Sequence, residues 1–156
     1  MHGIAAKGMT ASRREQILQA VVTTLAGTTL VGSRIWRSRV EALSRDEAPA
    51  IVVAPGIDKS IDQDRGGGSS FGKLDQELMI AIAVYVRGAP PDSIADPIEV
   101  DVHSKLMADR TIGGLAFDIY PVKRTPQIEE GDQIAGWLVT EYKVRYRTSF
   151  SDISAP

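Results

Sequence analysis

The 156-residue chain has no cysteine and two histidines. The lack of cysteine excludes disulfides, thiol nucleophiles and thiolate metal sites, and it fits a reducing cytoplasm. His2 falls in an expected N-terminal tail, whereas His103 falls on an expected helix, four residues after Glu99, where the two side chains form a surface pair. The histidines therefore predict neither a metal site nor a catalytic triad.

The sequence also lacks a strong net charge and a long apolar run. Eighteen basic and twenty acidic side chains leave a net charge of −2, so we do not expect the whole surface to bind phosphate or anionic lipid. No apolar segment approaches a membrane span, and we expect no membrane contact. The expected organisation is a flexible tail over residues 1–11, one domain over residues 12–150 and a C-terminal tail over residues 151–156.

Residues 73–88 predict a long strand at the centre of a sheet. From Leu74 to Val86 every second side chain is apolar except Gln76, which is the pattern of a strand with one buried face. The opposite side begins polar and then becomes apolar, through Asp75, Glu77, Met79, Ala81, Ala83 and Tyr85. A strand that is apolar on both sides predicts a second covering layer, from the same chain or from a neighbouring subunit.

Capping signals and apolar periodicity predict two helices. A capping box that starts at Ser12, with Gly27 as the residue after the helix, predicts a helix over residues 12–26. An Asp-Pro pair at residues 96–97 predicts a second helix over residues 97–109.

The remaining strands are expected at residues 34–39, 50–54, 116–122 and 137–150. Pro121 predicts a sheet edge or a bulge. Long polar connections are expected over residues 57–72 and 127–133. Together these elements predict an α+β fold, an antiparallel sheet of four to five strands with two helices packed on one face.

A glycine-rich segment, Gly67 to Lys73, matches the G-x-x-x-x-G-K spacing of a phosphate-binding loop. That loop requires a hydroxyl at the next position and a helix after it, but Leu74 follows, and it begins a strand pattern. A flexible hairpin loop is therefore the favoured interpretation, and a small nucleotide- or nucleic-acid-binding module is kept as an alternative function.

Acidic residues in the same loop have part of the spacing of a calcium site, but Lys73 stands where a bidentate glutamate belongs. We therefore expect a loop that becomes ordered on binding a partner, and its candidate residues are Asp58, Asp62, Asp64, Arg65, Gly67 and Phe71. Neither a nucleophile elbow nor an isolated carboxylate pair is present, so the sequence predicts no enzyme, no catalytic residues and no cofactor.

Basic residues gather in two parts of the sequence. Candidates for contact with a neighbouring subunit or a tube are Trp36, Arg37, Arg39 and Arg45. A second group lies on the last strand and comprises Lys143, Arg145 and Arg147. Two interpretations remain open. These bases make contacts with a neighbour or line a passage for a polyanion, or they pair within the chain with Asp46, Glu47, Asp75 and Glu77.

Four segments together resemble the tail terminator (tail completion) proteins of long-tailed bacteriophages, the minor tail protein U group. They are SRREQILQAVVTTLAG, RIWRSRVEALSRDEAPAIVVAPG, FGKLDQELMIAIAVYVRG and GWLVTEYKVRYRT. The resemblance runs from about Thr10 to Ser149. It rests on the arginine-rich segment before the strand at 51–55, on the strand that ends at Gly88 and on the closing strand.

The resemblance implies a small α+β subunit that forms a homo-oligomeric ring, a hexamer in the family, on the last ring of tail-tube protein. Such a ring stops tube growth and presents the surface to which the head connector or neck protein attaches, while DNA passes through the lumen without specific binding. The implied location is the head-proximal end of the virion tail, after assembly in the host bacterial cytoplasm. Another phage neck or tube subunit is the nearest alternative.

Overall fold

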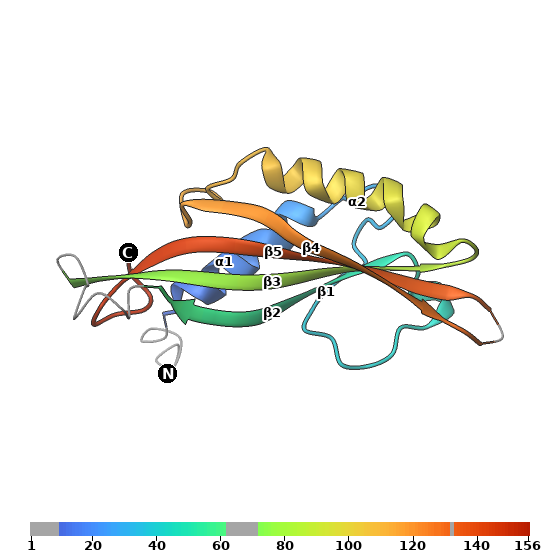
Figure 1. Ribbon diagram of the computed structural model, residues 1–156, viewed down its shortest axis with the longest axis horizontal. Helices are drawn as coiled ribbons and strands as arrows, with labels where there is room; N and C mark the ends of the chain where they lie inside the picture. Colours follow the sequence, from blue (N-terminus) through green and yellow to red (C-terminus); the bar gives the residue numbers. More distant parts are fainter. Residues whose placement is uncertain (1–9, 62–71, 132) are drawn as a thin grey trace, which may run out of the picture.

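A computed structural model describes residues 10–61, 72–131 and 133–156. It contains two α-helices, α1 (Arg13–Leu25) and α2 (Pro91–Met107), and a sheet of five strands. The strands are β1 (Ile35–Arg37), β2 (Ala50–Ser60), β3 (Lys73–Arg87), β4 (Asp118–Glu129) and β5 (Ala135–Ser149). Both helices share one core with one face of the sheet, which confirms the predicted α+β fold (Figure 1).

The strand β3 lies at the centre of the sheet, as predicted, in the order β1-β2-β3-β5-β4. It pairs antiparallel with β2 on one side and with β5 on the other. The expectation of a wholly antiparallel sheet is wrong at one edge, because β1 runs parallel to β2. Residues 38–49 form a crossover that brings the chain back to the same end of the sheet, which a parallel pair requires.

The helix α1 follows its sequence signals closely. The hydroxyl of Ser12 accepts a hydrogen bond from the Glu15 N–H at 3.1 Å, and the helix ends just before Gly27, whose φ of +79° is the left-handed conformation expected there. The predicted start of α2 is wrong, because the helix begins at Pro91 and contains Pro97 in its interior. Pro91 and Ala95 are both buried, so burial of the extra turns outweighs the backbone hydrogen bond that Pro97 cannot make.

Two strands extend further than predicted. The strand β2 continues from its predicted end near residue 54 to Ser60, and β4 continues from its predicted end near residue 122 to Glu129. Each passes a proline by a shift in register, the first between Pro55 and Asp58 and the second between Pro121 and Lys123. The prediction of an edge or bulge at Pro121 is confirmed. The loops expected over residues 57–72 and 127–133 were predicted too long, because their first residues belong to β2 and β4.

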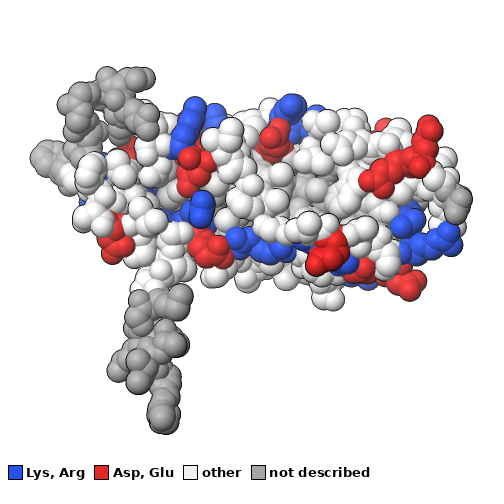
Figure 2. Space-filling model, turned by 90° about the horizontal axis from the view of Figure 1, so that it is seen from below, with Lys and Arg blue, Asp and Glu red and all other residues white. Residues whose placement is uncertain are grey.

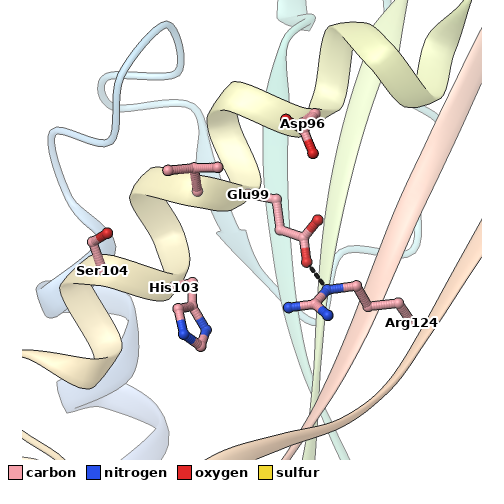
Figure 3. Close-up of a pocket in the computed structure, with 6 residues that line it drawn as sticks. Asp96, Glu99, His103, Ser104 and Arg124 are labelled. Carbon is pink, nitrogen blue, oxygen red and sulfur yellow. Dashed lines mark hydrogen bonds and ion pairs between the residues drawn. The ribbon is translucent and has the colours of Figure 1, made fainter.

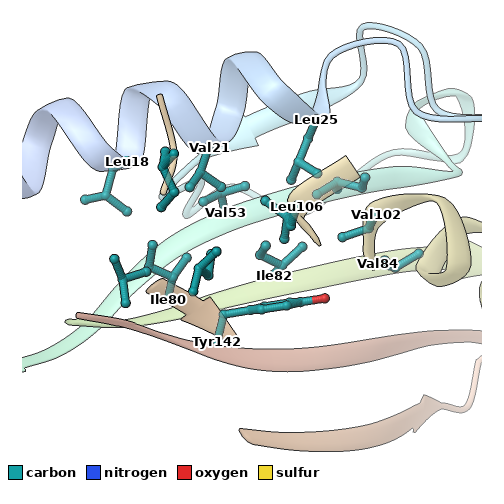
Figure 4. Close-up of a cluster of buried hydrophobic side chains, with 14 of the residues drawn as sticks. Leu18, Val21, Leu25, Val53, Ile80, Ile82, Val84, Val102, Leu106 and Tyr142 are labelled. Carbon is teal, nitrogen blue, oxygen red and sulfur yellow. The ribbon is translucent and has the colours of Figure 1, made fainter. Parts of the chain in front are cut away.

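The main core lies between the helices and the sheet (Figure 4). Figure 4 shows side chains of both helices meeting side chains of β2, β3 and β5: Leu18, Val21, Leu25, Val102 and Leu106 with Val53, Ile80, Ile82, Val84 and Tyr142. All of these side chains are buried. The apolar surface that they remove from water is the main stabilising contribution of the fold.

The C-terminal residues return to the first turn of α1. The Arg13 N–H donates to the Ile153 carbonyl at 2.7 Å, and the Gln16 side chain donates to the Ser154 carbonyl at 3.1 Å. The division into one domain and two terminal tails stays a prediction. Within the described ranges, neither helix has the length and apolar character needed to cross a membrane.

The contact between α2 and β5 depends on Gly136. A Cβ atom at this position would lie 2.5 Å from Pro91 Cβ and 2.9 Å from the Gln127 carbonyl oxygen. We predict that Gly136→Ala lowers the free energy of unfolding by about 1–3 kcal/mol, because helix and strand must separate. Urea unfolding measures the change. The matched control is Gly131→Ala, where the nearest atom is 4.0 Å away. Equal losses in the two variants would contradict the prediction.

Candidate interaction surface

The face of the sheet opposite the helices is called the open face below. Its side chains alternate along each strand with those of the main core. Its central rows are in register: Val52 lies beside Ala83, which lies beside Val139, and Ala54 lies beside Ala81.

One end of the open face is covered by the crossover of residues 38–49. Leu43 from this segment is buried against Ala50, Tyr85 and Ala135. Two half-buried indoles, Trp36 and Trp137, pack around them, and the Tyr85 and Trp137 rings lie with centroids 4.7 Å apart. Trp36 therefore belongs to a small second core, with the Arg39 guanidinium 4.6 Å from its ring. In the sequence, the alternation along residues 137–150 puts Trp137 on the same side of its strand as Glu141 and Lys143. The pairing of β5 with β3 then places Trp137 beside Tyr85.

The rest of the apolar surface on the open face is left partly exposed. We call it the apolar strip, and it consists of six half-buried residues: Val52, Ala54, Met79, Ala81, Ala83 and Val139. Val52 also packs against the second core and joins it to the strip. The sequence predicted a covering layer over residues 79–85. Within the described residues, the crossover covers Tyr85, whereas the apolar strip stays half-exposed.

A hollow of about 220 Å³ lies at the Met79 end of the strip. It is lined by Ile57, Lys59, Glu77, Met79 and Lys143, and Ile57 is 74% exposed. Both lysine ammonium groups lie 3.9 Å from the same Glu77 carboxylate oxygen, so two positive charges share one negative charge. The hollow is therefore apolar at Met79 and Ile57 and basic at its rim.

Beyond the hollow, the open face carries a ladder of opposite charges. Asp75 and Arg147 face each other across β3 and β5, and the guanidinium donates at 2.6 Å and 3.1 Å to the carboxylate. These hydrogen bonds hold the pKa of Asp75 below its usual value. Of the two interpretations of the bases on the last strand, pairing within the chain is therefore the correct one for Asp75 and Glu77. On the side shown in Figure 2, basic and acidic side chains likewise lie next to each other.

Two of the three candidate interface arginines are engaged within the chain. The Arg37 guanidinium donates two hydrogen bonds of 2.9 Å to Glu15 on α1, which hold the pKa of that carboxyl below its usual value. Arg39 binds the carboxylate of Glu47 within the crossover, and this contact, with the Ser44 N–H, lowers the pKa of Glu47 to about 2. Both arginines hold β1 and the crossover in place, and their role at an interface stays a prediction.

Arg45 differs from these two arginines because it is exposed and has no ion pair among the described residues. It lines a hollow of about 280 Å³ at the covered end of the open face, together with Arg87, Glu129 and Glu130. Glu129 accepts a hydrogen bond from the Trp137 indole at 3.0 Å. Charges of both signs therefore meet in this hollow.

The expected binding loop is only partly described by the structure. Asp58 does not lie in a loop, because β2 continues through it, and its carboxylate accepts a hydrogen bond of 2.6 Å from the Tyr146 hydroxyl. Burial raises the pKa of Asp58. The other candidates, Asp62, Asp64, Arg65, Gly67 and Phe71, lie outside the described residues. Lys73 is the first residue of β3, so a strand occupies the place of the helix that a phosphate-binding loop needs.

A pocket of about 370 Å³ lies between α2 and β4 (Figure 3), lined by Asp96, Glu99, Val100, His103, Ser104 and Arg124. Glu99 is 8% exposed, and its carboxylate is bound by Arg124 and by the Thr140 hydroxyl. The predicted surface pair of Glu99 with His103 is wrong, because Glu99 points toward the sheet. Among the residues with described positions, no group of three His, Asp or Glu side chains is placed to hold a metal ion.

No protein-family model and no curated protein matches this chain. Among solved structures, it is similar to a chain in the virion of a native gene transfer agent (GTA) particle. The two are 12% identical, the match covers 94% of this chain and 99% of the other, and the TM-score is 0.42. A likeness this distant does not show a shared function.

The Glu99–Arg124 contact predicts a clear difference between two ion pairs. Replacing Arg124 by Met leaves a buried carboxylate without its cation, and we expect the free energy of unfolding to fall by about 1–3 kcal/mol. The matched control is Arg110→Met, whose partner Asp118 is more exposed. There we expect a loss below about 1 kcal/mol. Urea unfolding at pH 7 measures both losses, and a larger loss for the Arg110 variant would contradict the prediction.

Proposed function

We propose that this chain is a tail terminator subunit of a long-tailed bacteriophage. In this proposal several copies form a closed ring on the last ring of the tail tube. The ring stops further addition of tube subunits and presents the surface to which the head joins. The chain acts through the shape and chemistry of its surfaces.

The observation that carries the proposal is the apolar strip of the open face. Its residues stay half-exposed in the middle of the sheet, and paired charges surround them toward one end. A protein interface commonly has this arrangement, an apolar centre with a polar rim. A neighbouring subunit over the strip would complete the burial of β3 on its second side.

The resemblance in sequence supports the more specific part of the proposal. Its four segments fall on α1, on β1 through β2, on β3 and on β5, which are the elements that build the core and the open face. The hexameric number, the tube and connector partners, the lumen for DNA and the head-proximal position are all inferred from that resemblance. A heterologous contact that closes on itself generates such a ring.

A tube or neck subunit is the nearest alternative, because it would use a similar contact. The difference is that a tube subunit continues to add, whereas a terminator ring closes and stops. The size of the assembly as the protein concentration rises therefore separates the two functions.

We predict that light scattering detects a closed oligomer of fixed mass, either in the free protein or once tail tubes are added. Replacing Ala83, in the centre of the strip, by Arg introduces a charge that the interface must bury, and we expect assembly to be lost while far-UV circular dichroism is unchanged. The matched control is Thr23→Arg on the exposed side of α1, which should assemble like the wild type.

Three results would contradict this proposal. A mass that keeps growing with concentration would indicate a tube subunit, and a persistent monomer that ignores tubes would exclude the ring. Normal assembly of a folded Ala83→Arg variant would show that the open face is not the contact surface.

A further inference from the structure

We infer that neighbouring copies contact head to tail, with the open-face hollow of one copy against α2 of the next. The inference rests on the proposed ring function and names the two surfaces that meet. The first surface is the hollow at the Met79 end of the apolar strip. The second, called the α2 arc, is an exposed strip of α2 that contains Asp92, Asp96 and Val100.

Contact through the free strand edges is disfavoured by prolines. In β2, the backbone groups of Ile51 and Val53 point to the outer edge, where the Ile51 N–H donates to Arg34 and the Val53 carbonyl accepts from Ser38. Because alternate residues of a strand point to the same edge, Pro55 is the next residue that faces outward, and it has no N–H to donate. In β4 the register with β5 runs unbroken through Pro126, so the missing N–H is on the outer side. A strand edge interrupted by proline is a poor template for another strand. The other edge strand, β1, has only three residues. These edges therefore favour contact through the faces of the sheet and the helix layer.

The hollow has a local excess of positive charge. Lys59 and Lys143 share the single carboxylate of Glu77. Arg145 lies between Glu77 and Asp118 in the register, and it is exposed with no ion pair among the described residues. The Glu77 carboxylate thus faces three bases, and Asp118, on the other side of Arg145, is already bound by Arg110. Of the other acids on the same face, Asp75 is bound by Arg147, and Glu141 lies opposite Lys123 in the register with β4.

The α2 arc has the complementary character. Asp92 and Asp96 are four residues apart on the exposed side of the helix, and neither has an ion pair in the described part of the chain. Val100, one further turn along, is 59% exposed. Two free carboxylates beside an apolar side chain match a basic rim beside Met79 and Ile57.

The two surfaces lie on opposite layers of the same chain, because α2 packs on the core face of the sheet and the hollow lies on the open face. The two surfaces of one copy therefore cannot contact each other, but the hollow of one copy can contact the α2 arc of the next. A contact between two different surfaces of identical chains is heterologous, and with suitable rotation it closes into a ring.

Charge reversal on each surface tests the inference, in the free or tube-bound state in which the wild type assembles. One variant carries Asp92→Lys and Asp96→Lys, and the other carries Lys59→Glu and Arg145→Glu, all at exposed positions. Each variant alone should raise the concentration needed for assembly about tenfold or more.

A 1:1 mixture of the two variants should restore the wild-type mass, because every junction in an alternating ring then pairs opposite charges. Matched controls are Arg14→Glu and Glu130→Lys, which should assemble normally.

The outcomes separate this inference from the proposed function. If the wild type forms a closed ring but the α2 variant assembles normally, or if the mixture does not restore assembly, the pairing of these two surfaces is wrong and the ring stands. If the wild type stays monomeric with and without tubes, the proposed ring fails, and this contact fails with it.

Discussion

The structure depends on one strand that is apolar on both of its sides. The side of β3 from Leu78 to Val86 is buried against both helices, and this burial sets the register with β2 and β5, since a slip of one residue would turn those side chains to solvent. The other side is buried at Tyr85 but half-exposed from Met79 to Ala83. The first side explains the fold of the chain, and the second provides the basis for its proposed function.

The sequence predicted those elements whose signals are local. The alternation in β3 and β5 and the capping of α1 are written in adjacent residues, and these predictions are confirmed. Predictions failed where a distant contact decided the outcome. The Asp96-Pro97 signal did not start α2, because Pro91 and Ala95 are buried by tertiary packing. Glu99 could not be recognised as buried, because its partner Arg124 lies in the part of β4 beyond the predicted end of that strand.

The candidate contact residues show the same limit. Arg37, Arg39 and Arg45 look alike in the sequence, but Glu15, which binds Arg37, is 22 residues away. Once Arg37 and Arg39 are assigned to the fold, the charges without an ion pair among the described residues include Arg45, Arg145 on the open face and Asp96 on α2. The ion pairs of Arg37 and Arg39 are formed within the chain, whereas the hollow and the α2 arc combine charges that lack such partners with exposed apolar side chains.

The central claim is that a ring of this chain ends the growth of a tail tube. Electron microscopy of growing tubes tests it most directly, with purified chain added and tube subunits still in excess. We predict a cap at a tube end, with elongation arrested at that end in proportion to the caps present. Tubes that keep lengthening at capped ends, or chain bound along their sides, would contradict it.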